Sequence, residues 1–202
     1  MVTPTFREER ALLARGFLII AGVDEVGCGC LAGPVYAGAV ILPLTSRIGL
    51  IRDSKLLSAA QRERVAEQIQ RAATDFAVGS ASVEEIDAMN IRRAAGLAMR
   101  RAIEALHVVP QYVLVDAFRI PGVRIPHKNI IRGDRYVKSI AAASIIAKVA
   151  RDKYLQKLDS EYPDYGFAQH KGYGTRQHQN ALRRLGPSKV HRKSFAPVRE
   201  LF

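Results

Sequence analysis

Four acidic residues stand in places where acidic residues are uncommon. Asp24 and Glu25 end one apolar stretch, and Asp116 ends another. Asp134 lies just before an Ala-rich segment. Aspartate and glutamate rarely occupy such surroundings unless they are paired or bound to a cation, and the ends of neighbouring strands are a usual place for functional sites in α/β sheets. These four carboxylates are therefore our candidates for the chemistry of this chain.

Gathered in one place, four carboxylates would repel one another strongly, and divalent cations would remove that repulsion. Carboxylate oxygens are hard ligands that suit Mg²⁺ or Mn²⁺ rather than zinc. Two such ions about 3.5–4 Å apart can activate a water molecule and stabilise the leaving oxygen of a phosphodiester. The alternative is that each residue is an ordinary loop or strand-end carboxylate. Asp24 and Glu25 should also point to opposite faces of a regular strand, so the strand must twist or end there for both to reach one site.

Apolar periodicity and turn residues predict the elements that would position these carboxylates. Strands are expected at residues 17–25, 35–42, 76–83, 112–116 and 129–131, with a Gly- and Pro-containing turn at 27–34. Helices are expected through residue 73 from a capping Ser58, at 84–106 with a break near Asn90, at 135–160 and at 175–185. This order indicates an α/β fold whose mixed central sheet is flanked by helices, and the N-terminal hairpin argues against an all-parallel sheet.

Composition favours a folded domain with a polyanionic partner. Apolar residues form 48% of the 202 residues, and no repeat or linker is visible, which predicts one domain over residues 1–202 with a helical segment from about residue 163. Lysine and arginine number 31 against 19 aspartates and glutamates, a net charge of +12. Binding to nucleic acid is the simplest explanation of this positive charge, and the alternative is a basic surface that only contacts solvent. No apolar run reaches about 18 residues, so no membrane partner is expected. Two cysteines, Cys28 and Cys30, are too few for a disulfide framework and fit a reducing, cytoplasmic setting.

Several short motifs in a fixed order carry a family resemblance. They are AGVDEVG at 21–27, LAGPV at 31–35, DSK at 53–55, VDA at 115–117, GD at 133–134, SIAAASIIAKV at 139–149 with RD at 151–152, HKGYGT at 170–175 and HRKSF at 191–195. Any one of them could arise by chance, but the ordered set is highly specific and spans nearly the whole chain. On these residues the chain resembles ribonuclease HII, the bacterial type 2 ribonuclease H.

The resemblance implies a ribonuclease H fold with a C-terminal helical extension. It also implies that Asp24, Glu25, Asp116 and Asp134 form a catalytic set that binds two Mn²⁺ or Mg²⁺ ions. The expected reaction is hydrolysis on the 5′ side of a ribonucleotide, which leaves 3′-hydroxyl and 5′-phosphate ends. RNA/DNA hybrids and duplex DNA with an embedded ribonucleotide would be the substrates, and we expect the chain to act as a monomer.

Eight further residues are candidates for holding the substrate. They are Gly27, Cys28 and Gly29 in the turn, Lys55, Ser144, Lys148 and Lys171 for phosphate, and Tyr173, which resembles the family tyrosine that packs on the deoxyribose after the ribonucleotide. Glycine lets backbone groups approach a sugar closely, and lysine and serine suit phosphate. The alternatives are ordinary helix surface for Ser144 and Lys148 and a partly buried loop aromatic for Tyr173. His170 could contact phosphate or simply form hydrogen bonds within its loop.

Two positions depart from the family pattern. The family usually has arginine where this chain has Cys28, so a fixed charge with forked donors is missing from the turn. It commonly has a second lysine where this chain has Leu56. The alternative function is therefore a nucleic-acid-binding protein on the same fold, with catalysis or specificity impaired by Cys28. A more distant alternative is a basic ribosome- or RNA-associated structural protein, which would explain the charge but not the carboxylates.

Overall fold

A five-stranded mixed sheet forms the centre of the molecule. The computed structural model describes residues 3–51, 54, 57–117 and 120–201. The strands lie in the order β3-β2-β1-β4-β5, and their bounds are Ile20–Val26 (β1), Val35–Ile41 (β2), Asp75–Ala81 (β3), Tyr112–Asp116 (β4) and His127–Ile130 (β5). Strands β1, β2 and β3 pair antiparallel, whereas β1, β4 and β5 pair parallel. The predicted mixed sheet is confirmed.

The register of the sheet brings two of the predicted carboxylates to neighbouring strand ends. Val23 on β1 lies opposite Val115 on β4. Asp24 and Asp116 each follow that pair by one residue, so they lie at the carboxyl ends of two adjacent parallel strands. On its other side Asp24 lies opposite Gly38 of β2. Such strand ends are where α/β sheets usually place their sites.

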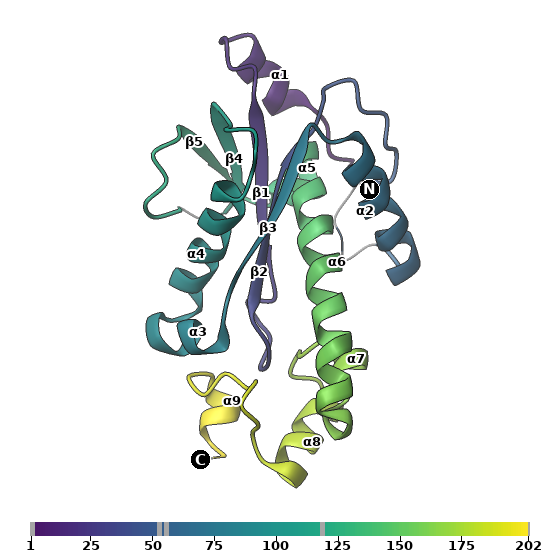
Figure 1. Cartoon of the computed structure of the whole chain (residues 1–202), viewed down its shortest axis with the longest axis vertical. Coiled ribbons are helices and arrows are strands. Elements are labelled where there is room, and N and C mark those ends of the chain that lie inside the picture. Colours follow the sequence, from purple (N-terminus) through teal and green to yellow (C-terminus); the bar gives the residue numbers. More distant parts are fainter. Residues whose placement is uncertain (1–2, 52–53, 55–56, 118–119, 202) are drawn as a thin grey trace.

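Helices cover both faces of the sheet (Figure 1). Their bounds are Arg7–Leu13 (α1), Ala59–Ala72 (α2), Val83–Met89 (α3), Ile91–Glu104 (α4), Gly133–Tyr136 (α5), Lys138–Glu161 (α6), Phe167–His170 (α7), Arg176–Leu185 (α8) and Ala196–Arg199 (α9), with a short 3-10 helix, η2, at Pro163–Tyr165. On one face Ala98 and Met99 of α4 share an apolar cluster with Val23. On the other face Ile69 of α2 and Ile145 of α6 belong to a second cluster. The carboxylate-bearing strands are thus held between two apolar layers.

Glycines let α6 lie directly on β1 and β2. A Cβ atom on Gly22 would lie 2.2 Å from the carbonyl carbon of Ser139, and one on Gly38 would lie 2.4 Å from the carbonyl oxygen of Ala143. The start of α6 is held by Glu9 of α1, whose Oε1 accepts a hydrogen bond from the backbone N of Ser139 at 3.0 Å. These contacts fix the height of α6 above the strand ends that carry the carboxylates.

The chain after α6 forms a helical extension at one end of the molecule, as the resemblance implied (Figure 1). It begins with η2, close to the residue at which the helical segment was predicted. Phe167 is fully buried there and packs in a cluster with Tyr165, Leu182 and Val198. No helix in the described part of the chain is long and apolar enough to cross a membrane.

Several predicted boundaries differ from the structure, among them the start of β1 at Ile20 and the bounds of β5, and two of the differences have identifiable reasons. The strand predicted at 76–83 ends earlier, because Ser82 caps α3 and Val83 is the first residue of that helix. The helix predicted at 135–160 is divided, because Val137 is extended and forms a bridge with Thr5. Asp134 therefore lies within the short helix α5. The break predicted near Asn90 is confirmed, since α3 ends and α4 begins there.

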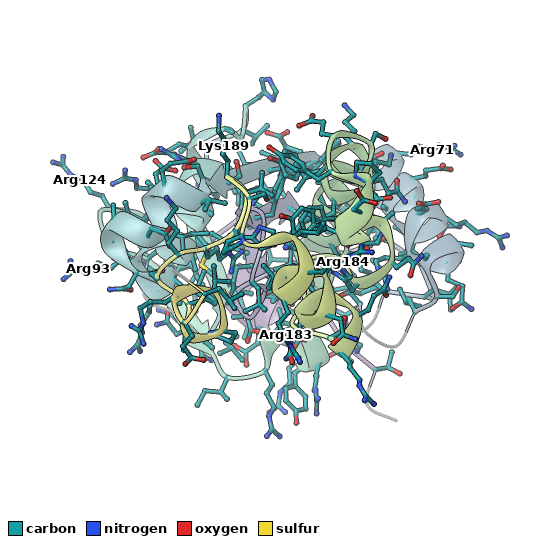
Figure 2. The ribbon with its side chains drawn as sticks, turned by 90° about the horizontal axis from the view of Figure 1, so that it is seen from below. Arg71, Arg93, Arg124, Arg183, Arg184 and Lys189 are labelled. Atoms are coloured by element: carbon teal, nitrogen blue, oxygen red, sulfur yellow. The ribbon has the colours of Figure 1, made fainter. Side chains whose placement is uncertain are left out.

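Basic side chains extend outward around much of the molecule when it is seen from the end that carries the extension (Figure 2). Arg93 and Arg124 extend on one side and Arg71 on the opposite side, while Arg183 and Arg184 come from α8. The net charge of +12 is therefore spread over the surface. Positive charge that is spread over the surface attracts a polyanion from many directions and does not indicate where it binds. The binding site must therefore be identified from the arrangement of its residues.

Candidate active site

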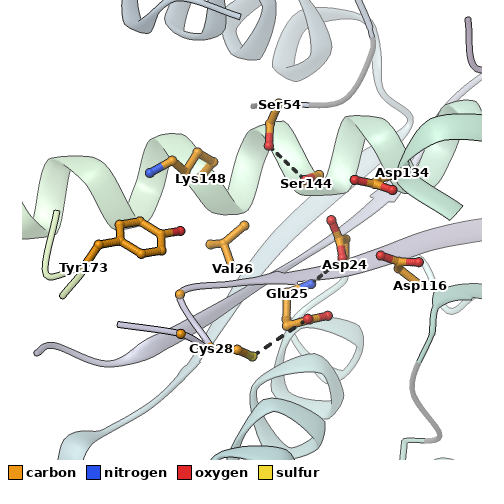
Figure 3. A pocket seen from close by; sticks show the side chains of 12 residues that line it. Asp24, Glu25, Val26, Cys28, Ser54, Asp116, Asp134, Ser144, Lys148 and Tyr173 are labelled. Carbon is orange, nitrogen blue, oxygen red and sulfur yellow. Dashed lines mark hydrogen bonds between the residues drawn. The ribbon is translucent and has the colours of Figure 1, made fainter. Parts of the chain in front are cut away.

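A cavity of about 220 Å³ opens at the carboxyl ends of β1 and β4. Its walls also include the turn after β1, the start of α5, the middle of α6 and the loop before α8 (Figure 3). The lining residues are Asp24, Glu25, Val26, Gly27, Cys28, Gly29, Ser54, Asp116, Asp134, Ser144, Lys148 and Tyr173. All four predicted carboxylates are among them.

Three of these carboxylates come from three different elements. Asp24 on β1 is 4% exposed and Asp134 on α5 is 6% exposed. Asp116 ends β4, and its Oδ1 accepts a hydrogen bond from the backbone N of Gly133 at 2.7 Å. That bond ties the end of β4 to the start of α5 and so brings Asp134 close to Asp116. Figure 3 shows the three carboxylates facing a common space.

Glu25 reaches the cavity from the opposite side of its strand. Neighbouring strand residues point to opposite faces, but β1 ends at Val26, so both acidic side chains can border a cavity at its tip. Oε1 of Glu25 lies 3.8 Å from Sγ of Cys28. The backbone N of Glu25 donates to Oδ1 of Asp24 at 2.8 Å. The condition that the strand must end or twist at this pair is met.

Burial and mutual repulsion raise the pKa values of these carboxyl groups. Burial is the largest cause that raises the pKa of Asp24 well above its ordinary value, and the negative charges of Glu25, Asp116 and Asp134 add to the effect. Burial also raises the pKa of Glu25 to about 7. Holding all four groups ionised therefore requires positive charge within the cavity.

The donors of the cavity fit a hard divalent cation. All four groups offer carboxylate oxygens, which Mg²⁺ and Mn²⁺ prefer. Within the described residues, Oε2 of Glu25 is buried and has no hydrogen-bond partner, so it is available to a metal ion. Across the same residues no three His, Cys, Asp or Glu side chains are arranged to hold an ion as they stand.

In the presence of a chelator, the protein should lose stability as the pH rises from about 4.5 to 7. The folded pKa of Glu25 is raised to about 7, so the native state binds this proton more tightly than the unfolded chain. That contribution to stability is fully present below the unfolded pKa of about 4.3 and is lost as the pH rises through the folded value. Urea unfolding at several pH values measures it, with Glu25→Gln as the comparison. The free energy of unfolding should fall less steeply with pH in the variant than in the unmodified protein. An equal dependence on pH in both proteins would contradict a raised pKa for Glu25.

Three of the predicted substrate contacts outside the turn line the cavity. Ser144 and Lys148 lie on α6, and Nζ of Lys148 is 5.8 Å from the centre of the Tyr173 ring. Lys171 is not among the lining residues; its backbone is left-handed, with φ of 51°, in the turn that leads to Tyr173. Lys55, together with the departure at position 56, lies outside the described residues.

Two polar residues belong to the site although no role was predicted for them. Ser54 is 3% exposed, and its Oγ lies 3.2 Å from Oγ of Ser144. Asp152 accepts a hydrogen bond from Nζ of Lys148 at 2.6 Å and another from Nη1 of Arg62 at 3.3 Å. The spacing of four residues between Lys148 and Asp152 on one helix was a usable signal for that pair. For Ser54 the only signal in the sequence was its position within the DSK motif at 53–55.

Two buried arginines shape the turn at Gly27–Gly29. Nη1 of Arg192 donates to the carbonyl of Cys28 at 3.1 Å. Arg151 lies so close to Gly27 that a Cβ atom there would be 2.3 Å from its Nε, and Gly27 has φ of 91°, which glycine adopts easily. Both arginines are fully buried. They come from parts of the chain far from the turn, so local sequence could not reveal them as its supports.

Comparison with known proteins gives a consistent result. The family model described as Ribonuclease HII matches residues 21–198. The protein named ribonuclease HII in Desulfitobacterium hafniense strain Y51 is 53% identical over 194 residues, which cover 96% of this chain and 75% of that protein. The one in Chloroflexus aggregans is 49% identical over 205 residues, with 99% and 97% covered. Among solved structures, ribonuclease H2 from Pyrococcus horikoshii matches with a TM-score of 0.77 and 25% identity, over 91% of this chain and 97% of that one.

Proposed function

Because this chain belongs to the ribonuclease HII family, a family of metal-dependent endoribonucleases, we propose that it hydrolyses the phosphodiester bond on the 5′ side of a ribonucleotide. Its substrates would be RNA/DNA hybrids and duplex DNA with embedded ribonucleotides, and its products would carry 3′-hydroxyl and 5′-phosphate ends. The observation that supports this best is the meeting of four carboxylates, distant in sequence, around one cavity.

The carboxylates would hold two Mg²⁺ or Mn²⁺ ions. When bound, such ions supply an activated water molecule and stabilise the departing 3′-oxygen. The protein's own contribution is to keep the four oxygen donors at fixed strand and helix ends and to place cationic and hydroxyl groups beside them. Ser144 and Lys148 line the wall next to the carboxylates, where a phosphate would lie.

Discrimination of RNA from DNA must depend on the 2′-hydroxyl. The turn after β1 lines the cavity, and a Cβ atom on Gly29 would meet nothing within 4 Å, so this backbone borders open space. Backbone groups of Gly27–Gly29 can therefore approach a sugar. Tyr173 also lines the cavity and is 40% exposed as a residue, which leaves aromatic surface for the neighbouring deoxyribose. We assign sugar recognition to these two features.

A cleavage assay tests the proposal. Duplex DNA with one ribonucleotide is incubated with the full chain and Mn²⁺ or Mg²⁺, and the cut is mapped at single-nucleotide resolution. We expect a cut 5′ to the ribonucleotide, no cut in the all-DNA duplex, and loss of cleavage when a chelator is added. Binding without cutting would favour the impaired nucleic-acid-binding alternative. The carboxylates argue against that alternative, because negative charge facing phosphate weakens binding unless it holds cations.

Changing Cys28 to arginine should raise kcat/KM for the single-ribonucleotide substrate by roughly tenfold, the effect of one charge-assisted hydrogen bond. Burial and the charge of Glu25 raise the pKa of the Cys28 thiol to about 12. The group therefore stays neutral at pH 7 and brings no charge to the turn. Cys28→Met is the matched control, because it adds length without charge. Equal rates for the arginine and methionine variants would show that the missing guanidinium does not limit this enzyme.

We propose that the reaction takes place in the cytoplasm. Cys28 and Cys30 are both free thiols, which agrees with a reducing, cytoplasmic compartment. We propose that the chain acts there as a monomer.

A further inference from the structure

Three histidines meet in the C-terminal extension, next to the loop that carries Tyr173. His178 and His191 are fully buried and His170 is 7% exposed. The rings of His170 and His178 stack with their centres 4.2 Å apart. Nε2 of His178 lies 3.0 Å from Nε2 of His191. None of the three lines the candidate active site, so the cleavage mechanism gives them no direct role.

The partners of each ring determine where its proton lies. Nδ1 of His178 lies 3.0 Å from the carbonyl oxygen of Tyr173. A carbonyl only accepts, so this nitrogen carries the proton and Nε2 of a neutral ring is free to accept. Nδ1 of His191 accepts from the backbone N of Ser188 at 3.0 Å, so Nε2 of His191 carries a proton and donates to His178. The result is one directed chain from Ser188 through both rings to Tyr173.

His170 supports the same loop by a separate pair of hydrogen bonds. Its Nδ1 accepts from the backbone N of Gly172 at 3.2 Å, and its Nε2 lies 2.7 Å from the carbonyl of Tyr165. The ordinary alternative for His170, hydrogen bonding within its loop, is therefore confirmed. It fixes the residue just before Tyr173, whereas His178 fixes Tyr173 itself.

We propose that His178, oriented by His191, is a positioning residue that holds the backbone of Tyr173 so that the exposed ring can pack on the sugar of the substrate. The inference rests on the proposed function, because it assigns Tyr173 to substrate binding. Tyr173 is 40% exposed, and Nζ of Lys148 lies 5.8 Å from the centre of its ring. Its backbone helps to set the direction of the ring, and its carbonyl accepts from Nδ1 of His178 and from the N of Thr175 at 2.8 Å.

His178 cannot take a second proton without breaking the chain. A proton on Nε2 of His178 would face the N–H of His191. Burial, followed by the charge of a neighbouring histidine, lowers the pKa of both rings to about 4. The other groups that act on the cluster are the backbones of Tyr165, Gly172, Tyr173 and Ser188, the hydroxyl of Ser188, and the carboxylate of Asp159, which acts on His170. The chain is therefore complete at neutral pH.

The tautomers can be measured directly in the unmodified protein. Long-range ¹H–¹⁵N spectra of the full chain at pH 7 should show His178 protonated at Nδ1 and His191 protonated at Nε2. His178→Asn and His191→Gln assign the two signals. A proton on Nε2 of His178 would overturn the proposal, whatever the activity of the protein.

A double-mutant cycle separates positioning from plain stabilisation. His178→Phe keeps a ring to stack on His170 but removes both nitrogens. It should raise KM for the single-ribonucleotide substrate about tenfold, with kcat nearly unchanged, because a hydrogen bond that orients a binding group acts through affinity. His178→Asn, whose amide can replace the donor at Nδ1, should recover most of the loss.

In a Tyr173→Ala background, His178→Phe should raise KM less than about twofold, because a residue that acts only through Tyr173 has nothing left to position. The same increase in both backgrounds would overturn the proposal. If the unmodified protein does not cleave at all, the proposed function fails. KM is then replaced by the Kd for the same duplex, and the cycle and the tautomer measurement still decide the role of His178.

Discussion

Replacing Asp24 with asparagine is expected to lower the cleavage rate at a single ribonucleotide by at least about 10³-fold, a loss of roughly 4 kcal/mol of transition-state stabilisation. The change keeps the size of the side chain and removes one charge from the centre of the carboxylate group. Asp24 is the member whose pKa is raised by the charges of all three others as well as by burial. It is therefore the member that we expect to contribute most to holding the cations.

The matched control is Asp164→Asn, an exposed residue of η2 outside the cavity, which should cleave at nearly the normal rate. Binding separates catalysis from affinity. In the presence of a chelator, Asp24→Asn should bind the duplex at least as tightly as the unmodified protein, because it removes a charge that repels phosphate. Cleavage within about tenfold of normal would show that Asp24 is not a metal ligand.

The same substitution has an expected effect on stability that does not depend on activity. Because burial and repulsion raise the folded pKa of Asp24, its ionised form is disfavoured in the native state at neutral pH. Removing the charge should therefore stabilise the metal-free protein at pH 8, as seen in urea unfolding with a chelator present. Added Mn²⁺ should reverse the order, since it stabilises the unmodified protein more than the variant. A variant that is less stable under both conditions would contradict the electrostatic account.

Much of the site could be predicted from the sequence, because its carboxylates follow apolar strands. Asp24 lies near the end of such a strand and Asp116 ends another, and parallel pairing brings those ends together. The position of Asp134 within a separate helix could not be predicted in the same way. Val137 interrupts the helix only because it pairs with Thr5, a residue more than 130 positions away in sequence. Tertiary contacts of this kind override local helix propensity.

The supports of the site were harder to predict than its carboxylates. Arg151 and Arg192 belong to motifs that the sequence displays, but in the structure they donate to backbone carbonyls between Cys28 and Pro34. Every residue has a backbone carbonyl with the same chemistry, so the sequence does not reveal which carbonyl an arginine will contact. The same holds for His178, whose partner is the carbonyl of Tyr173. Residues that act on side chains leave a pattern, whereas residues that act on the backbone become visible only in three dimensions.

Gly38→Ala is expected to reduce the free energy of unfolding by at least about 3 kcal/mol, the effect of a strong overpacking. The added Cβ would lie 2.4 Å from the carbonyl oxygen of Ala143 and 3.1 Å from its carbonyl carbon. These are backbone atoms of α6, so no side-chain rotation can relieve the contact. Either α6 moves away from the sheet or the sheet bends, and in both cases the apolar layer between them opens.

The loss should extend to cleavage, because Gly38 lies opposite Asp24 in the sheet and Ala143 directly precedes Ser144 on α6. Gly49→Ala is the matched control: nothing lies within 4 Å of a Cβ atom there, and its unfolding free energy should change by no more than about 0.5 kcal/mol. Urea unfolding and the cleavage rate at saturating substrate measure the two effects. A Gly38→Ala protein with a normal unfolding midpoint would mean that α6 can stand further from the sheet. The close packing of α6 on β1 and β2 would then not be required to hold the carboxylates and Ser144 in one cavity.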